Sequence, residues 1–204
     1  TIIMNLFGTL EIKIGGADVD LSGQWPAISF RELIMKYSNI DIDVYNDKDK
    51  LLNKIKEDKI EIDSETPLEN LGYGNLVDQL YKKVARPHLI NPIFLTEHPI
   101  SLSPLARAND ENPNITDRFQ LVINGAEIIN AYSELVDPVE QERRLLKQAE
   151  LKAAGDEEAM CMDYDYIEAM EYGMPPISGW GMGIDRLMQL LTNSDNIKDC
   201  ILFP

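Results

Sequence analysis

The sequence predicts an α+β fold, and three observations support this prediction. Segments in which apolar and polar residues alternate, as in half-buried strands, occur near both ends of the chain. Apolar residues at helical spacing follow residue types that cap helices, mainly in the middle and toward the C-terminus. The chain has 204 residues, 44% of them hydrophobic, which is enough for one sizeable core or for a core with a small subdomain.

Residues 1–29 are predicted to form the first segment, with a β-hairpin in it. Alternation over residues 10–14 resumes over residues 19–21, and Gly15-Gly16 lies between the two runs. Glycine suits such a turn because it adopts positive φ without a steric cost. We therefore expect two short antiparallel strands here.

Residues 30–86 are predicted to be a helical segment with a polar surface. Ser29 and Glu32 have the spacing of a capping box, in which the serine accepts from a free backbone N–H and the glutamate reaches back. A charged run after Asp47 carries leucine and isoleucine at helical spacing, which is typical of a surface helix. Helices are expected from Ser29 to about Tyr37, from Asp47 to Lys59, after Thr66-Pro67, and from Asn75 to just before Pro87.

Residues 87–204 form the third predicted segment, where function is expected to concentrate. It contains the strongest hairpin signal of the chain, because Asn124-Gly125 suits the two positive φ angles of a type I′ turn. Residues 118–123 should therefore pair with the strand that follows. Further elements are expected at Ile93–Leu95 (strand), from Asp137 to Gly155 and from Asp163 to Gly173 (helices), and from Gly179 (a strand that leads into a C-terminal helix).

Simple pairing across the two-residue turn places polar side chains on predictable faces. Asn130, Tyr132 and Glu134 share one face, because side chains alternate along a strand. A row of amide, aromatic ring and carboxylate suits a small polar cation, with the ring as a wall and the carboxylate fixing an ammonium group. The alternative is an exposed edge strand with a polar outer face.

The same pairing matches Gln120 with Ile129 and puts Gln120 and Glu127 on the opposite face, as diagonal neighbours. Together they can share a hard cation such as Mg²⁺. One carboxylate and one amide make a weak magnesium site unless substrate phosphates add ligands. A site that joins Glu127 to Asn130 would require a bulge or a strong twist between them.

Glycines at every second position mark the strand before the C-terminal helix. Gly179, Gly181 and Gly183 leave one face of this strand without side chains, so that it can lie flat against a planar group. Arg186 follows at the start of the helix, within reach of a phosphate or a ring. The alternative is close backbone packing with Arg186 in a structural ion pair. A dinucleotide-binding loop fits less well, because that motif opens a βαβ unit.

Charge and hydropathy limit the classes of partner. The net charge of −16 argues against a broad contact with a nucleic-acid backbone, so any tRNA contact is expected to be local or to lie elsewhere. Apolar runs are broken well short of the roughly 20 residues that span a bilayer, and the N-terminus lacks the order of a signal peptide. We expect a soluble, cytoplasmic protein with no membrane partner.

Several segments resemble one enzyme family. Gly179 to Arg186 is similar to motif 3 of the class II aminoacyl-tRNA synthetases. Thr96–Pro99, Ser101–Arg107, Asn130–Leu135 and Gly155–Met160 each resemble stretches of the lysyl-tRNA synthetases, closely in the third segment and more loosely before it. The resemblance implies part of the class II antiparallel sheet with flanking helices, in which residues 30–86 would be a helical insertion between motifs 2 and 3.

The resemblance also implies a role for each candidate residue. Glu134 matches the carboxylate that recognises the ε-ammonium of L-lysine, Tyr132 the aromatic wall and Asn130 a polar contact in that pocket. Glu127 matches a carboxylate that holds Mg²⁺ on ATP, and Gln120 stands where many members have a second metal-binding glutamate. The remaining matches are Gly181 and Gly183 with the adenine floor, and Arg186 with a catalytic arginine that meets the γ-phosphate and adenine.

The implied reaction is that of a lysine–tRNA ligase, which activates lysine with ATP and transfers it to tRNA-Lys, as a homodimer in the full-length enzyme. Nothing in the sequence resembles motif 1, motif 2 or an anticodon-binding domain. We therefore interpret the chain as a C-terminal catalytic-domain fragment that is inactive by itself. Two alternatives remain: a non-catalytic, regulatory module that binds ATP and lysine, and a lysine-activating paralogue that modifies a protein.

Overall fold

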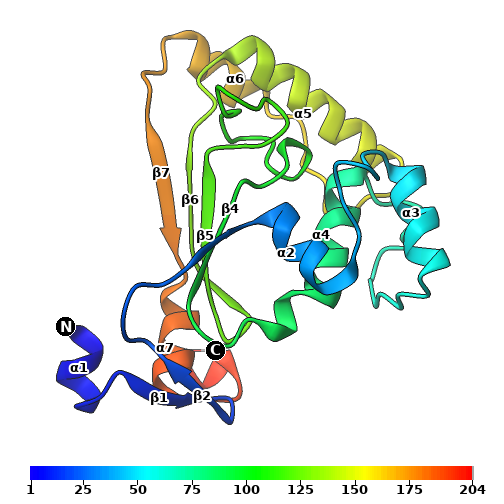
Figure 1. Cartoon of the computed structure of the whole chain (residues 1–204). Coiled ribbons are helices and arrows are strands. Elements are labelled where there is room, and N and C mark those ends of the chain that lie inside the picture. The colour runs from blue at the N-terminus through cyan, green and yellow to red at the C-terminus, as the bar shows by residue number, and fades with distance from the viewer. Residues whose placement is uncertain (204) are drawn as a thin grey trace.

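A mixed five-stranded sheet is the centre of the molecule, as the computed structural model shows (Figure 1). The structure describes residues 1–203; Pro204, the last residue of the predicted third segment, lies outside the described residues. The first two strands are parallel and the other pairs antiparallel. The α+β prediction is thus confirmed. In sheet order the strands are β3 (Ala27–Ser29), β4 (Ile93–Thr96), β5 (Arg118–Ile123), β6 (Ala126–Ser133) and β7 (Ser178–Met182).

The predicted N-terminal hairpin is confirmed as a separate two-stranded sheet of β1 (Glu11–Ile14) and β2 (Ala17–Asp20). Its turn packs beside the C-terminal helix α7 (Ile184–Thr192), since the amide of Gly15 donates to Asn193 Oδ1 at 2.7 Å. The blue and red ends of the chain accordingly meet at the lower end of Figure 1. The helix α1 (Ile2–Phe7) was not predicted, because six residues are too few to show a helical period.

Three helices follow β3: α2 (Phe30–Ser38), α3 (Lys48–Glu57) and α4 (Tyr73–Val84). The capping box at Ser29 is confirmed, with both of its hydrogen bonds formed. The helix expected after Thr66-Pro67 is wrong, because that stretch forms turns and α4 begins only after Gly72. A tertiary contact decides this boundary: the buried Asp156 accepts from the amide of Gly72 at 2.7 Å.

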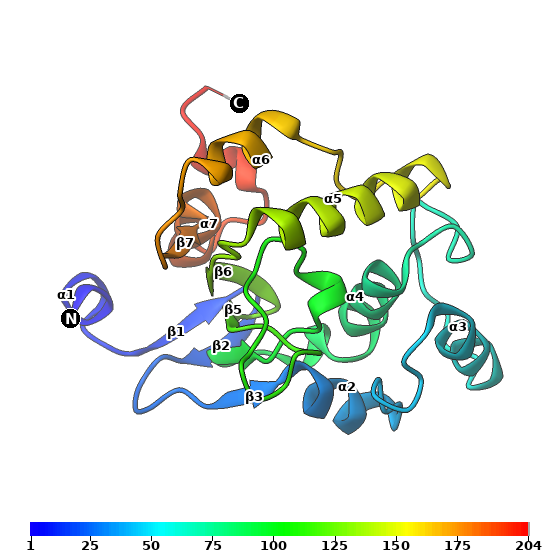
Figure 2. The ribbon, with the colours of Figure 1, turned by 90° about the horizontal axis from the view of Figure 1, so that it is seen from above.

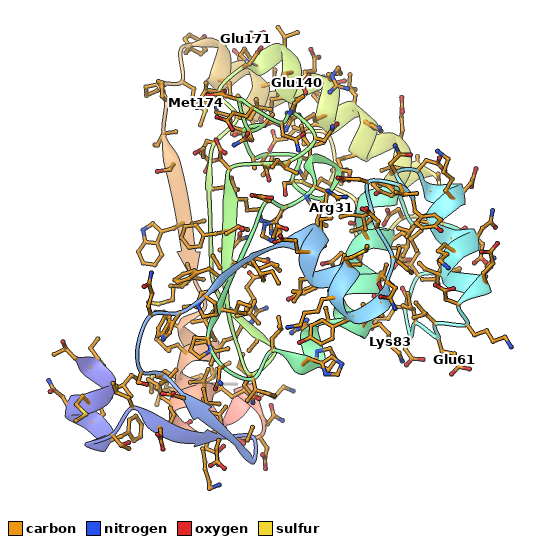
Figure 3. The ribbon with its side chains drawn as sticks, viewed as in Figure 1. Arg31, Glu61, Lys83, Glu140, Glu171 and Met174 are labelled. Atoms are coloured by element: carbon orange, nitrogen blue, oxygen red, sulfur yellow. The ribbon has the colours of Figure 1, made fainter. Side chains whose placement is uncertain are left out.

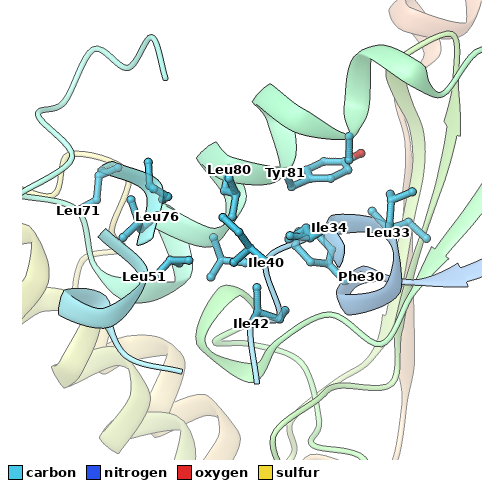
Figure 4. Packing of buried hydrophobic residues seen from close by; sticks show 14 of the residues in the cluster. Phe30, Leu33, Ile34, Ile40, Ile42, Leu51, Leu71, Leu76, Leu80 and Tyr81 are labelled. Atoms are coloured by element: carbon cyan, nitrogen blue, oxygen red, sulfur yellow. The ribbon is translucent and has the colours of Figure 1, made fainter. Parts of the chain in front are cut away.

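The largest hydrophobic core lies between these helices and one face of the sheet (Figure 4). Leucine and isoleucine side chains of α2, α3 and α4 pack together, and Leu95 and Val122 join them from β4 and β5. Helical segment and sheet therefore share one core. The division into segments 1–29, 30–86 and 87–204 stays a prediction. Fully buried members of this core include Phe30, Leu33, Ile34, Ile40, Leu51, Leu71, Leu76 and Leu80.

A second core covers the opposite face of the sheet. Leu121 and Ile128, both buried, contact Ile14 and Val19 of the hairpin and Leu190 of α7. The face that carries Leu121 is thus covered by the N-terminal hairpin and the C-terminal helix. Beyond the ends of α2 and α4, these helices no longer cover the other face of the sheet. We call this uncovered part, on β5, β6 and β7, the free face.

The helices α5 (Pro138–Ala153) and α6 (Tyr164–Glu171) close one end of the sheet. Viewed from above, α5 starts beside β6 and α6 and runs toward the side of α3 (Figure 2). Leu145 of α5 packs against Ile167 and Met170 of α6. Both helices begin where they were predicted, with the side chains of Asp137 and Asp163 as N-caps. Short 3₁₀ turns lie at Arg86–His88, Ile100–Leu102 and Ile197–Cys200, and no helix within residues 1–203 is both long and apolar enough to span a membrane.

Candidate functional site

The free face of β5, β6 and β7 carries four of the eight predicted site residues, Gln120, Asn130, Tyr132 and Gly181, in two rows. Residues in register on neighbouring strands point to the same face of a sheet, so each row is a line of adjacent side chains. One row ends at Gly179 and the other at Gly181, which leaves the edge strand bare on this face. The rows are Arg118–Tyr132–Gly179 and Gln120–Asn130–Gly181.

A β-bulge at Ile128 extends this face to Glu127. Leu121 pairs with Ile129, but Val122 pairs with Glu127, so that Ile128 is an extra residue between the two pairs. The simple register is therefore wrong: Gln120 pairs with Asn130 instead of Ile129. The expectation that Glu127 and Gln120 lie on the face opposite Asn130 is wrong for the same reason. All of them share one face.

Gln120 connects Glu127 to a buried histidine. Its Nε2 donates to Glu127 Oε2, and its Oε1 lies 3.0 Å from His98 Nε2. His98 is fully buried, with its ring 5.1 Å from that of Phe30. Burial, followed by the positive charge of Arg118, lowers the pKa of His98 to about 3, so the ring is neutral at physiological pH.

Arg118 forms a hydrogen bond to the side chain of Asn130, as Gln120 does to Glu127. Its Nε donates to Asn130 Oδ1 at 3.0 Å, while Nη1 donates to Ser103 Oγ at 2.9 Å and to the carbonyl of Leu102 at 3.3 Å. Because these partners are neutral, burial lowers the pKa of Arg118. With its oxygen occupied, the Asn130 amide presents its N–H groups to the free face.

The start of α7 is attached to the bulge. The amide of Gly183 donates to the carbonyl of Ile128 at 3.0 Å, and the exposed Arg186 donates to the carbonyl of Glu127 at 3.1 Å. The stem of Arg186 also lies against Gly183, where a Cβ would meet its Cδ at 3.3 Å. The extra residue in β6 thereby places Arg186 beside Glu127.

Tyr132 and Glu134 lie at a pocket of about 700 Å³ between the sheet and α6. Its other walls are residues 160–166, Leu105 and Leu145. Burial raises the pKa of Glu134, and burial followed by the charge of Glu134 raises the pKa of Tyr132. A partly buried carboxylate beside an aromatic ring is suited to a cationic ligand.

The loop from Ser101 to Arg107 forms the border of this pocket. The amide of Arg107 donates to the carbonyl of Ser133 at 2.7 Å, and Ala106 pairs with Glu134 in an isolated bridge. From α5, Arg144 donates to the carbonyl of Ala106 at 2.8 Å. Arg144 is itself paired at 2.7 Å with Glu140, which lies in the first turn of α5 and is labelled in Figure 3. The loop is thus fixed from both sides.

The two glycines that face the site differ in their surroundings. A Cβ on Gly179 would lie 2.5 Å from Glu134 Oε1, whereas a Cβ on Gly181 would meet nothing within 4 Å. Gly179 therefore makes room for the carboxylate. Gly181 borders open space, as a floor for a planar group requires. Neither has positive φ, so their value lies in the missing side chain and not in backbone freedom.

Few groups that can bind a metal lie together in this chain. Within residues 1–203, no cluster of three or more His, Cys, Asp or Glu side chains is placed to hold an ion. Glu127 is the carboxylate on the site face beside Arg186, and Gln120 bonds to it. One carboxylate fits a Mg²⁺ that arrives on substrate phosphates, as is usual for this ion, but does not form a site alone.

Sequence reasoning assigned no role to His98 or Arg118. Both lie in segments it used, since His98 is in the stretch 96–99 and Arg118 starts the predicted hairpin. Arg118 pairs with Tyr132 only because of the bulge, whereas the simple register places it opposite Ala131, so no signal for it was available in the sequence. The contact of His98 with Gln120 joins the segment after β4 to β5 and requires the folded chain.

The whole chain matches a known family. The family profile described as tRNA synthetases class II (D, K and N) matches residues 1–204. The chain belongs to the class II tRNA synthetases. The predicted membership is therefore confirmed, and the α+β architecture with its largely antiparallel sheet agrees with a class II catalytic domain.

Three relatives, each named lysine–tRNA ligase, illustrate the similarity within this family. The protein of Thermosipho africanus (strain TCF52B) is 43% identical over 203 residues, which is 100% of this chain and 39% of the relative. That of Helicobacter hepaticus (strain ATCC 51449 / 3B1) is 46% identical over 187 residues, 92% of this chain and 35% of the relative. That of Pelotomaculum thermopropionicum is 42% identical over 203 residues. This class II chain thus spans about 40% of their length.

Proposed function

We propose that this chain forms part of the catalytic domain of a lysine–tRNA ligase. The observation that carries the proposal is the partly buried pair of Tyr132 and Glu134 at a pocket on the class II sheet. A carboxylate in that position favours lysine over the aspartate or asparagine that related class II enzymes use, because only lysine brings a cationic side chain. The similarity to relatives named lysine–tRNA ligase supports the same choice.

In this proposal the lysine lies across β6. Glu134 binds its ε-ammonium group and Tyr132 forms the aromatic wall. Asn130 directs its N–H groups at an oxygen of the substrate, because Arg118 occupies the amide oxygen. A row of carboxylate, ring and amide along one strand therefore matches a ligand with a cation at one end and a carboxylate at the other.

ATP lies over the bare end of the same face. Gly181 offers open space to the adenine ring, Gly183 continues the strand into α7, and Arg186 meets the γ-phosphate and adenine. Glu127, which adjoins Arg186, holds the Mg²⁺ that accompanies the phosphates. When bound, that ion neutralises phosphate charge.

The proposed chemistry needs no protein nucleophile. A carboxylate oxygen of lysine attacks the α-phosphorus of ATP, the bond to the pyrophosphate leaving group breaks, and lysyl-adenylate forms. The chain contributes position and charge: Glu134 and Asn130 orient the lysine, and Arg186 stabilises the triphosphate. Transfer to tRNA-Lys then follows, and we propose that the full-length enzyme acts as a homodimer in the cytoplasm.

The test is lysine-dependent exchange of pyrophosphate into ATP by the full-length protein that carries this chain. We expect exchange with lysine and none with aspartate or asparagine, the two other amino acids of the family profile. Glu134→Gln should abolish most of the exchange and leave ATP binding intact. Exchange with aspartate or asparagine in place of lysine contradicts the specificity, and binding of ATP and lysine without exchange identifies a regulatory module instead.

A further inference from the structure

His98 is a buried group that the proposed reaction does not use directly. It is 0% exposed, and its Nε2 is 3.0 Å from Gln120 Oε1. Gln120, at 8% exposed, separates it from Glu127. A chain of hydrogen bonds thus leads from the interior, at Phe30 and His98, to the carboxylate at the surface of the site.

The direction of each hydrogen bond in this chain is fixed by chemistry. The Glu127 carboxylate can only accept, so the Gln120 atom that faces it must be the amide nitrogen. The amide oxygen then faces His98, whose Nε2 must carry the proton and donate it. Reversal of the amide would place its oxygen against a carboxylate oxygen of Glu127, which cannot donate.

This direction decides what Gln120 can do for a cation. A hard cation such as Mg²⁺ binds the oxygen of an amide, not its N–H₂ group. That oxygen is turned into the interior and accepts from His98. The bond to Glu127 uses Oε2 and leaves Oε1 of the carboxylate to an ion.

We propose that Gln120 is not a metal ligand, and that His98 and Gln120 are positioning residues which orient the Glu127 carboxylate toward the divalent cation of the nucleotide. This inference rests on the proposed function, since it requires that ATP binds beside Glu127 with its ion. It replaces the expectation that Gln120 and Glu127 share a metal. Groups that bond to a metal ligand typically change metal affinity about 10- to 100-fold when removed.

The experiment compares ATP binding with and without Mg²⁺ in the full-length protein, by calorimetry. His98→Leu removes the donor, so the strengthening of ATP binding by Mg²⁺ should fall about 10-fold. ATP binding without the ion and lysine binding should stay unchanged. His98→Gln, whose amide can donate to Gln120, is the matched variant and should recover most of the loss.

The alternative, that Gln120 is a metal ligand, predicts a different change in the effect of Mg²⁺ on ATP binding. If Gln120 binds the ion through its oxygen, His98→Leu frees that oxygen, and the effect of Mg²⁺ grows or stays as it is; either result overturns the proposal. An equal loss with and without Mg²⁺ also overturns it, because it shows a general packing role. Thermal melting checks that the variants fold. If His98→Leu does not fold, the shorter polar His98→Asn takes its place with the same expectation.

ATP binding distinguishes a failure of the proposed function from a failure of the inference about His98 and Gln120. If the parent protein binds no ATP at all, both the proposed function and this inference are wrong. If ATP binds with a clear Mg²⁺ dependence that His98→Leu leaves unaltered, only the inference about His98 and Gln120 is wrong.

Discussion

Replacing Gly179 with alanine is expected to weaken lysine binding without unfolding the protein. The new Cβ would lie 2.5 Å from Glu134 Oε1, and contacts under 3.0 Å essentially do not occur for real Cβ atoms. The carboxylate must therefore retreat by at least 0.5 Å, the difference between these two distances. It can do so at little cost, because it is the far end of a flexible side chain.

The magnitude follows from the displacement of the charge. At an effective dielectric constant of about 20, lengthening an ammonium–carboxylate contact from about 3 Å to about 3.5–4 Å loses roughly 0.8–1.4 kcal/mol. Lysine affinity should then fall about 4- to 10-fold. The free energy of unfolding should not decrease, since Gly→Ala at a compatible backbone position stabilises a protein by about 0.4–1 kcal/mol.

Gly181→Ala is the matched control on the same strand and the same face. Its Cβ meets nothing within 4 Å, so Glu134 should stay in place and lysine affinity should be unchanged. The added methyl group would instead stand on the proposed adenine floor and weaken ATP binding. The two variants together predict a crossed pattern, which equilibrium binding of lysine and of ATP to the full-length protein can measure.

Unchanged lysine affinity in a Gly179→Ala variant that melts like the parent would contradict the proposed displacement of Glu134. Equal weakening of lysine and ATP binding by both variants would contradict it as well, because that result would mean a general distortion of β7. If Gly179→Ala weakens only ATP binding and Gly181→Ala weakens only lysine binding, the positions that we propose for lysine and adenine must be exchanged.

Three further predictions concern single residues. Because burial raises the pKa of Glu134, its charge is lost at a higher pH than for an ordinary glutamate. Lysine affinity should therefore fall as the pH is lowered through that raised pKa. A pH series of binding constants for Glu134→Gln should show no such fall. Arg118→Lys keeps the charge but loses the planar fork that holds Asn130, so KM for lysine should rise roughly 10-fold in pyrophosphate exchange, with ATP little affected. Asp156→Ala leaves the buried amides of Gly72 and Asn75 without an acceptor, and urea unfolding should show a loss of about 3 kcal/mol.

Local signals explain why most elements were predictable from the sequence. The turn at Asn124-Gly125 has φ of 47° and 70°, the two positive angles that this residue pair favours, and the cap at Ser29 forms as its spacing requires. Each of these features depends on residues a few positions apart. The false helix at Thr66-Pro67 shows the limit: Asp156, 84 residues away from Gly72, determines where α4 begins.

The candidate site was predictable only where strand alternation determines it. Asn130 and Tyr132 lie in β6 and Glu134 directly follows its end, all at period two, so the sequence sufficed to place them on one face. The buried supports were not predictable, because His98 contacts Gln120 across 22 positions and Arg118 contacts Ser103 through a loop. No local pattern indicates such contacts.

The bulge at Ile128 makes one site out of two sets of residues that simple alternation would separate. The turn pairs Glu127 with Val122 in either register, so unbroken alternation from there would turn Asn130 toward the core beneath the hairpin and α7, where an unpaired amide is costly. Ile128 fills that core itself, at 3% exposed, while its carbonyl accepts from Gly183 and so fixes the start of α7. Arg186 then bonds to the carbonyl of Glu127. One inserted apolar residue therefore brings Asn130 and Tyr132 onto the face of the proposed metal-binding carboxylate and also sets the position of the arginine beside it, so that strand alternation alone does not show this arrangement.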